Sequence, residues 1–110
     1  MAHVLILYKL KSGVRREDFE NWLRTSNSAA LRGIKRLKEF AVYRVEKRVM
    51  ADGEPSADYF DLYDIPDIAG FVSEDIPSAA VRKNMEEFGG FAERPEYLLA
   101  TPLTGTALTK

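Results

Sequence analysis

Asp61 is the residue in this chain best suited to chemistry, because it interrupts an aromatic and apolar run, Tyr59-Phe60-Asp61-Leu62-Tyr63. Successive side chains of a strand point to opposite faces, so Asp61 shares its face with Tyr59 and Tyr63. A carboxylate in such surroundings must be hydrogen-bonded, ion-paired or protonated. With a pKa raised towards neutrality, Asp61 would be a candidate general base for proton transfer.

A basic partner for this carboxylate is predicted from the preceding strand. Asp52-Gly53 is typical of a hairpin turn, and a tight turn there would set Arg44 directly opposite Asp61. Two interpretations are open. In one, Arg44, Asp61, Tyr59 and Tyr63 form the polar lining of a ligand-binding cleft. In the other, Arg44 and Asp61 are a structural ion pair between strands, flanked by tyrosines.

The remaining candidates lie on two predicted helices. Trp22 and Ser26 are one turn apart on the apolar stripe of a helix predicted from about residue 15 to about residue 32. Phe88 lies on the apolar face of a second helix, which begins near Pro77. We predict that Trp22 and Phe88 form apolar walls of the cleft and that Ser26 hydrogen-bonds a ligand there. The alternatives are a core position for the tryptophan and a backbone or water contact for the serine.

Composition excludes several kinds of site. The chain has no cysteine and one histidine, which excludes disulfides, thiol nucleophiles and multi-histidine metal sites, so we expect no metal and no cofactor. A net charge of −1 gives no basic patch for nucleic acid or an anionic membrane. No apolar run is long enough to span a bilayer. We therefore expect a cytoplasmic protein that binds neither nucleic acids nor membranes.

The pattern along the chain predicts an α+β fold. Strands are expected at residues 3–10, 40–49, 58–65 and 97–103, with one helix after the first strand and another after the third. This βαββαβ order is that of a ferredoxin-like plait, in which two helices cover one face of a four-stranded antiparallel sheet. We predict a single domain over residues 1–103 and a loose C-terminal tail over residues 104–110.

The first strand predicts a second copy of the chain. Val4 and Ile6 point to one face and Leu5 and Leu7 to the other, so both faces of this strand require burial. The two helices of one chain cover only one face. A homodimer joined sheet to sheet, the dimeric α+β barrel, is the simplest way to cover the other.

Three groups of residues carry a resemblance to a known family. They are Phe19-x-x-Trp22 after Gly13-Val14, the strand pair 40–45 and 59–65, and Phe88-x-x-Phe91-Ala92-x-x-Pro95-x-Tyr97-Leu98-Leu99. Over nearly its whole length the chain resembles the REDY-like family, small dimeric α+β barrel proteins associated with prodigiosin-type pigment biosynthesis. The resemblance implies an accessory or small-molecule-binding role in secondary metabolism.

These observations lead to one functional hypothesis and two rivals. We expect a homodimer that binds an apolar aromatic or heterocyclic metabolite in a cleft between helices and sheet. The first rival is a cofactor-free enzyme, a monooxygenase, isomerase or cyclase, on the same barrel. The second is a purely structural dimeric scaffold.

Overall fold

The protein is a two-layer α+β structure with four antiparallel strands, as the sequence predicts. The structure, a computed structural model, describes residues 3–105. The sheet has the order β2-β3-β1-β4 and consists of β1 (His3–Leu10), β2 (Glu39–Arg44), β3 (Tyr59–Asp64) and β4 (Ala92–Ala100). This is the ferredoxin-like arrangement, in which the first and third strands are central.

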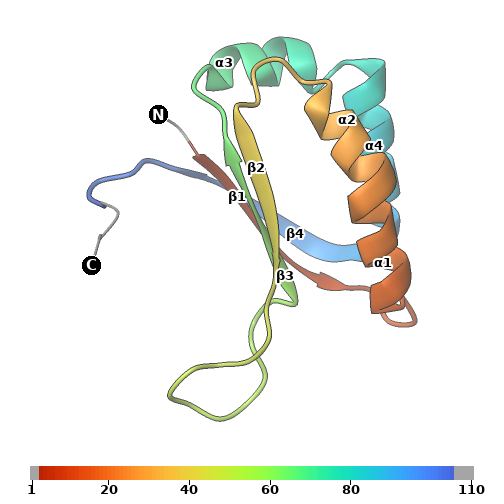
Figure 1. Ribbon diagram of the computed structural model, residues 1–110, viewed down its shortest axis with the longest axis vertical. Helices are drawn as coiled ribbons and strands as arrows, with labels where there is room; N and C mark the ends of the chain where they lie inside the picture. The colour runs from red at the N-terminus through yellow and green to blue at the C-terminus, as the bar shows by residue number, and fades with distance from the viewer. Residues whose placement is uncertain (1–2, 106–110) are drawn as a thin grey trace.

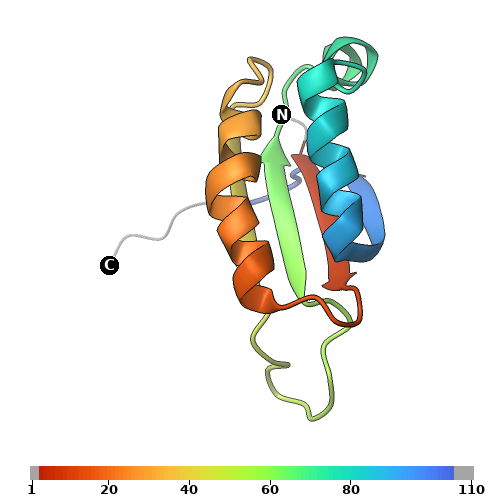
Figure 2. The same cartoon turned by 90° about the vertical axis from the view of Figure 1, so that its right-hand side faces the viewer.

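The helices gather on one face of this sheet and leave the other face bare (Figures 1 and 2). The first helical stretch joins α1 (Arg16–Trp22), the π-helical η1 (Leu23–Asn27) and α2 (Ser28–Arg32). After β3 come α3 (Ile68–Gly70), η2 (Phe71–Asp75) and α4 (Ala79–Phe91). Ser78 caps α4, since its hydroxyl accepts a hydrogen bond from the backbone N–H of Val81.

The π-helical segment η1 changes which residues of the first helix are buried. A π turn contains one more residue than an α turn, so the apolar stripe moves on by one position. Asn27 and Leu31 are buried, whereas Ser26 is exposed. The prediction that Ser26 lies on the buried stripe is therefore wrong, because it assumed an unbroken α-helical period.

The connection between β2 and β3 is a long loop, not the predicted tight turn at Asp52-Gly53. Strand β2 ends at Arg44, and residues 45–58 project from the body of the protein (Figure 1). A hydrogen bond from the Val45 N–H to the Asp58 carbonyl, 2.8 Å, closes the base of the loop. As a result Val42, not Arg44, lies opposite Asp61. The predicted register is wrong by two residues, which preserves the face on which each side chain lies.

The last strand begins earlier than expected. Arg94-Pro95 was predicted to precede this strand, but β4 already pairs with β1 from Ala92, opposite Leu10. The register shifts between Leu7 and Lys9, and Arg94 adopts a φ of 47°. A bulge of this kind lets a proline lie in an edge strand without loss of a ladder hydrogen bond.

Aromatic rings form the core between sheet and helices. Tyr8 packs edge-on against Phe88 and Phe19, with ring centroids 4.8 and 5.8 Å apart, and stacks on Tyr59. Trp22 is buried in the same cluster. These contacts hold the first helix and α4 against the central strands. They thereby determine the shape of the hollows between the helices and the sheet.

The uncovered face of the sheet is also apolar. Leu5 pairs with Leu62 and Leu98, and Leu7 pairs with Phe60. Tyr43 stacks on Phe60 with ring centroids 4.7 Å apart. We call this set the bare face; in the single chain Tyr43 is 48% exposed, Leu62 36% and Leu98 37%. The two-sided character predicted for the first strand is therefore present.

Two further expectations concern the whole chain. Within residues 3–105, no helix has the length and apolar character required to cross a membrane. Of the predicted tail, Thr104 and Gly105 are exposed, and residues 106–110 lie outside the described residues.

Candidate functional site

An apolar hollow lies between the sheet and the helices, next to Asp61. We call it the Asp61 cavity; its volume is about 400 Å³. Its sheet side is formed by Val4, Ile6, Asp61, Tyr63, Tyr97 and Leu99, and its helical side includes Leu31, Ile34, Phe71, Val81, Asn84, Met85 and Phe88. A mostly apolar hollow of this size with a few polar groups is typical of small-molecule sites, which measure roughly 300–1,000 Å³.

Asp61 is the polar centre of this cavity. Its carboxylate, in a residue that is 2% exposed, accepts a hydrogen bond from the Tyr8 hydroxyl at 2.7 Å and another from the Tyr63 hydroxyl at 2.9 Å. Burial raises the pKa of Asp61 to about 6, and the two tyrosine hydrogen bonds oppose that rise only in part. Burial and the Asp61 charge raise the pKa of both tyrosines, so they remain protonated donors.

A second polar group faces the cavity from the helical side. The Asn84 side-chain amide of α4 donates from Nδ2 to Oδ1 of Asn27 in η1, at 3.0 Å. Both residues line the Asp61 cavity. The bond joins α4 to the first helix, and Asn27 reaches it because the π turn brings this residue, rather than Ser26, to the buried face.

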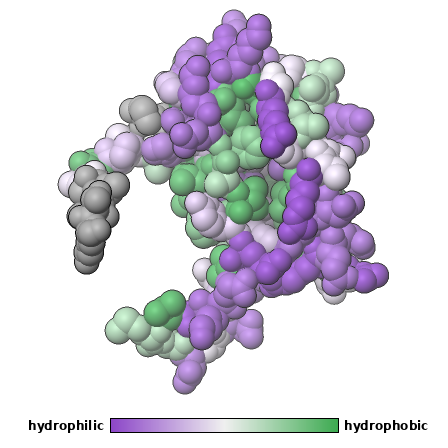
Figure 3. All heavy atoms as spheres, viewed as in Figure 1, coloured by the Kyte–Doolittle hydropathy of each residue, from purple (hydrophilic) through white to green (hydrophobic). Residues whose placement is uncertain are grey.

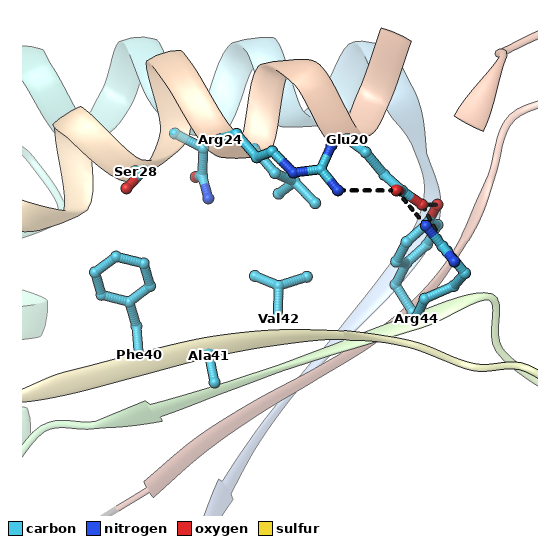
Figure 4. Close-up of a pocket in the computed structure, with 10 residues that line it drawn as sticks. Glu20, Arg24, Ser28, Phe40, Ala41, Val42 and Arg44 are labelled. Atoms are coloured by element: carbon cyan, nitrogen blue, oxygen red, sulfur yellow. Dashed lines mark hydrogen bonds and ion pairs between the residues drawn. The ribbon is translucent and has the colours of Figure 1, made fainter. Parts of the chain in front are cut away.

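Arg44 belongs to a separate, open depression that we call the Arg44 groove. It runs between the first helix and β2, and Glu20, Arg24, Asn27, Phe40, Val42 and Tyr59 line it together with Arg44. Figure 4 shows Phe40 and Val42 pointing up from β2 towards the helix, and Ala41 pointing away. Figure 3 shows apolar residues in the middle of this side of the molecule, with polar residues around them.

The charged end of the Arg44 groove is a network around Glu20. The Glu20 carboxylate accepts from Arg44 Nε at 2.8 Å, from Arg44 Nη2, and from the Tyr59 hydroxyl at 2.7 Å (Figure 4). The hydrogen bonds from Arg44, followed by that from Tyr59, lower the pKa of Glu20 to about 2. Glu20 therefore stays ionised. Arg44 forms its ion pair with Glu20 and not with Asp61.

The predicted site residues thus divide into four locations. Asp61, Tyr63 and Phe88 come together at the Asp61 cavity. Tyr59 and Arg44 lie at the Arg44 groove. Trp22 lies in the aromatic core, where its Nε1 donates to Glu87 at 2.9 Å, and Ser26 is exposed and lines neither space. The predicted direct pair of Arg44 with Asp61 does not form, because the strand register places Arg44 beside Tyr59 and Glu20.

The structure contains no obvious metal site in the part that is described. Among residues 3–105, no three His, Asp or Glu side chains are grouped so that they could hold a metal ion. Asp61 itself has two tyrosine hydroxyls, not further carboxylates, as neighbours. Asp61 and these two hydroxyls are groups suited to hydrogen bonding and proton transfer.

Sequence comparison identifies the family. The sequence profile of the family described as REDY-like protein HapK matches residues 2–103. The chain belongs to this family. Comparison with curated proteins finds no match for this REDY-like chain.

Solved structures share the fold of this REDY-like protein. HapK from Hahella chejuensis is 22% identical, with a TM-score of 0.78 over 99% of this chain and 100% of that one. SnoaB from Streptomyces nogalater, described as a cofactor-independent oxygenase, is 10% identical, with a TM-score of 0.73 over 94% of each chain. A dimeric ferredoxin-like protein from Thermobifida fusca is 14% identical, with a TM-score of 0.71 over 92% of this chain and 90% of that one. At these identities the likeness establishes the fold alone.

Sequence reasoning missed the contacts that four polar residues make at these two sites. Glu20 lies on a charged stretch of helix, and only its contact with Arg44 and Tyr59 explains its burial. Tyr8 alternates with Val4 and Ile6 along the first strand, and this spacing was the signal that Tyr8 lies on the same face of the sheet as they do. Asn27, next to Ser26, is a candidate hydrogen-bond donor from the sequence. Its contact with Asn84 gave no signal, because the π turn that brings the two residues together is invisible in the residue pattern.

Proposed function

We propose that this REDY-like protein binds a small, largely apolar aromatic or heterocyclic metabolite in the Asp61 cavity, as an accessory protein of secondary metabolism. The single observation that carries the proposal is the apolar cavity itself, with one buried carboxyl group at its sheet side. Nearly all of the lining is aliphatic or aromatic, which favours an apolar ligand. A link to prodigiosin-type pigments is what the family resemblance implies for the pathway. We further propose a cytoplasmic location.

We also propose that the working form is a homodimer joined through the bare face. In one chain the bare face exposes parts of Tyr43, Leu62 and Leu98 side by side on neighbouring strands. Exposed apolar patches of this kind commonly mark protein–protein contacts. The similar structure from Thermobifida fusca is described as dimeric. Apart from Leu98, which belongs to both surfaces, the lining of the Asp61 cavity lies outside the bare face and stays free in such a dimer.

One observation favours a second candidate function, cofactor-free acid–base catalysis. A carboxyl group with a pKa of about 6 is able both to accept and to release a proton near neutral pH. Such a group would remove a proton from an acidic C–H or O–H of a bound substrate, with Tyr8 and Tyr63 stabilising its charge. SnoaB, which has a similar fold, is described as a cofactor-independent oxygenase, and this supports cofactor-free catalysis as a second candidate.

Ligand-dependent melting tests the binding proposal. A panel of pyrroles, quinones and aromatic polyketides should contain a small set that raises the melting temperature, since a ligand that binds only the folded state stabilises it. Turnover in the same samples would favour the enzyme. No response to any member would favour the structural scaffold and contradict the binding proposal.

A matched pair of variants assigns any response to the Asp61 cavity. Val72 lines this cavity and is more than half exposed, so it marks the opening. Val72→Trp should narrow the opening and reduce the ligand-induced shift. Val49→Trp, in the exposed 45–58 loop, should leave the shift unchanged. Equal shifts in the two variants would place the ligand elsewhere.

A further inference from the structure

The charges around the Asp61 cavity restrict the kind of ligand that it can take. Asp61 is the one carboxyl group among the lining residues, and they include no lysine, arginine or histidine. An anionic ligand would therefore be removed from water beside a carboxyl group with no cation to balance it, which is strongly unfavourable. A neutral or cationic ligand meets no such barrier.

The hydrogen-bonding groups around Asp61 favour a ligand that donates. The hydroxyls of Tyr8 and Tyr63 already donate to Asp61, one to each carboxylate oxygen. A carboxylate oxygen accepts more than one hydrogen bond, so Asp61 keeps acceptor capacity while the two nearest hydroxyl donors are in use. The sheet side of the cavity thus offers an acceptor.

The helical side offers a second acceptor in Asn84. The Nδ2 of Asn84 donates to Asn27, whereas the Oδ1 of Asn84 is buried and has no hydrogen-bond partner among the described residues. A buried acceptor without a partner is unfavourable, and native structures normally supply a protein group, a water or a ligand. A small rotation of the Asn84 side chain would let Oδ1 accept a hydrogen bond from a ligand in the cavity.

We propose that the Asp61 cavity selects a neutral or cationic heteroaromatic ligand that carries N–H groups, with Asn84 and Asp61 as the acceptors on opposite walls. Asn84 is then a specificity-determining residue that recognises the donor. Anionic ligands such as carboxylates are excluded by Asp61. This inference rests on the proposed function, because it names the ligand class for the same cavity.

Four indoles separate these two requirements by titration calorimetry. Tryptamine and indole-3-propionate share a ring but carry opposite charges. The ring N–H of 3-methylindole is replaced in 1,3-dimethylindole by an N–methyl group, which cannot donate a hydrogen bond. We expect tryptamine to bind at least about tenfold more tightly than indole-3-propionate, and 3-methylindole at least about tenfold more tightly than 1,3-dimethylindole, the effect of one well-placed hydrogen bond.

Two variants assign each preference to its residue. Asn84→Leu, of similar size, should remove the preference for 3-methylindole while the affinity for 1,3-dimethylindole stays the same. Asp61→Asn should remove the preference for tryptamine over indole-3-propionate. Asn21→Leu, on the exposed side of α1, should change neither preference. If Asn84→Leu does not fold, the comparison of the two methylindoles on the wild-type protein still decides the donor requirement.

The outcomes separate this inference from the proposed function. Binding of all four indoles with equal affinity would leave the proposed function standing and overturn the donor requirement. Tighter binding of indole-3-propionate or of 1,3-dimethylindole would overturn it as well. Binding of none of the four would overturn the inference, whereas the proposed function would fail only if the wider panel of pyrroles, quinones and aromatic polyketides also gave no response.

Discussion

Asp61 owes its chemistry to its surroundings rather than to its residue type. The carboxyl group is buried under apolar side chains, and its two hydrogen bonds come from neutral tyrosines, not from a cation. Neutral donors compensate burial only in part, so the pKa is raised. Glu20 shows the opposite case, because an arginine supplies its hydrogen bonds and holds the pKa of Glu20 at about 2. Two buried carboxyl groups of one sheet–helix interface therefore differ in charge near pH 5.

The raised pKa of Asp61 predicts a pH-dependent effect of Asp61→Asn. In the unfolded chain the carboxyl group loses its proton near its ordinary pKa of 3.8, but in the folded protein only near 6. Stability of the wild-type protein therefore falls as pH rises through this window, by about 3 kcal/mol for a shift of this size. Because the asparagine does not ionise, the variant should gain about 3 kcal/mol relative to wild type between about pH 4 and pH 8.

Urea unfolding of both proteins at one protein concentration measures this difference. At about pH 4 both side chains are mostly neutral in the folded state, so that pH serves as the reference. Stability curves of wild type and Asp61→Asn that run parallel across the range would show that Asp61 has an ordinary pKa. A large loss of stability in Asp61→Asn at all pH values would instead point to a buried ion pair.

Glu20 provides a prediction with a matched control. Glu20→Leu would remove the acceptor of the buried Tyr59 hydroxyl and of Arg44, so we expect a loss of about 1–3 kcal/mol in the free energy of unfolding. Glu17→Leu removes an exposed pair with Arg15 from the same helix and should cost less than about 0.5 kcal/mol. Equal effects in urea unfolding would show that the Glu20 network contributes no more than a surface pair.

At the scale of elements, the sequence predicted which segments form strands and helices but not how they are joined. Alternation and helical spacing depend on local burial, and so they located β1, β3 and both long helices. The π turn at 23–27 and the loop at 45–58 leave no signal of their own in those patterns, although the π turn moves the buried stripe by one residue. Asp61, Tyr63 and Arg44 were therefore assigned to the right face, whereas the burial of Ser26 and the direct pairing of Arg44 with Asp61 were wrong.

The 45–58 loop yields an element-scale prediction. Because the Val45–Asp58 hydrogen bond closes the β2–β3 ladder at the base of the loop, the register does not depend on the residues beyond it. Replacing residues 46–57 with a short Asn-Gly turn should keep the fold and change the free energy of unfolding by less than about 1 kcal/mol. Backbone NMR of the variant would show unchanged β2–β3 pairing. A shift of that pairing by two residues, so that Arg44 lies opposite Asp61, would contradict the prediction.

At the scale of the whole molecule, the two faces of the sheet differ in what covers them. The helix-covered face holds the Asp61 cavity, and the bare face is available for a second copy of the chain. A standard stable interface buries roughly 1,600 Å² in total, about 800 Å² from each partner. A contact of that size over the bare face would complete the burial of β1.

Leu62→Glu tests the homodimer. The substitution places a charge in the middle of the bare face, and burying that charge against a partner is unfavourable, so the variant should be monomeric at micromolar concentration. Val72→Glu, on the helical side of the molecule, should keep the wild-type mass. Sedimentation equilibrium distinguishes the two. A wild-type protein that is itself monomeric, or a Leu62→Glu dimer, would exclude the bare face as the interface.

The most direct test of the account is methyl NMR of the protein titrated with 3-methylindole. Ile6, Leu31 and Val81 line the Asp61 cavity, whereas Leu5, Leu7 and Leu62 lie on the bare face. The account predicts saturable shifts of the cavity methyl groups while the methyl groups of the bare face stay in place. Shifts confined to the bare face, or no shifts at all, would contradict a binding site at Asp61.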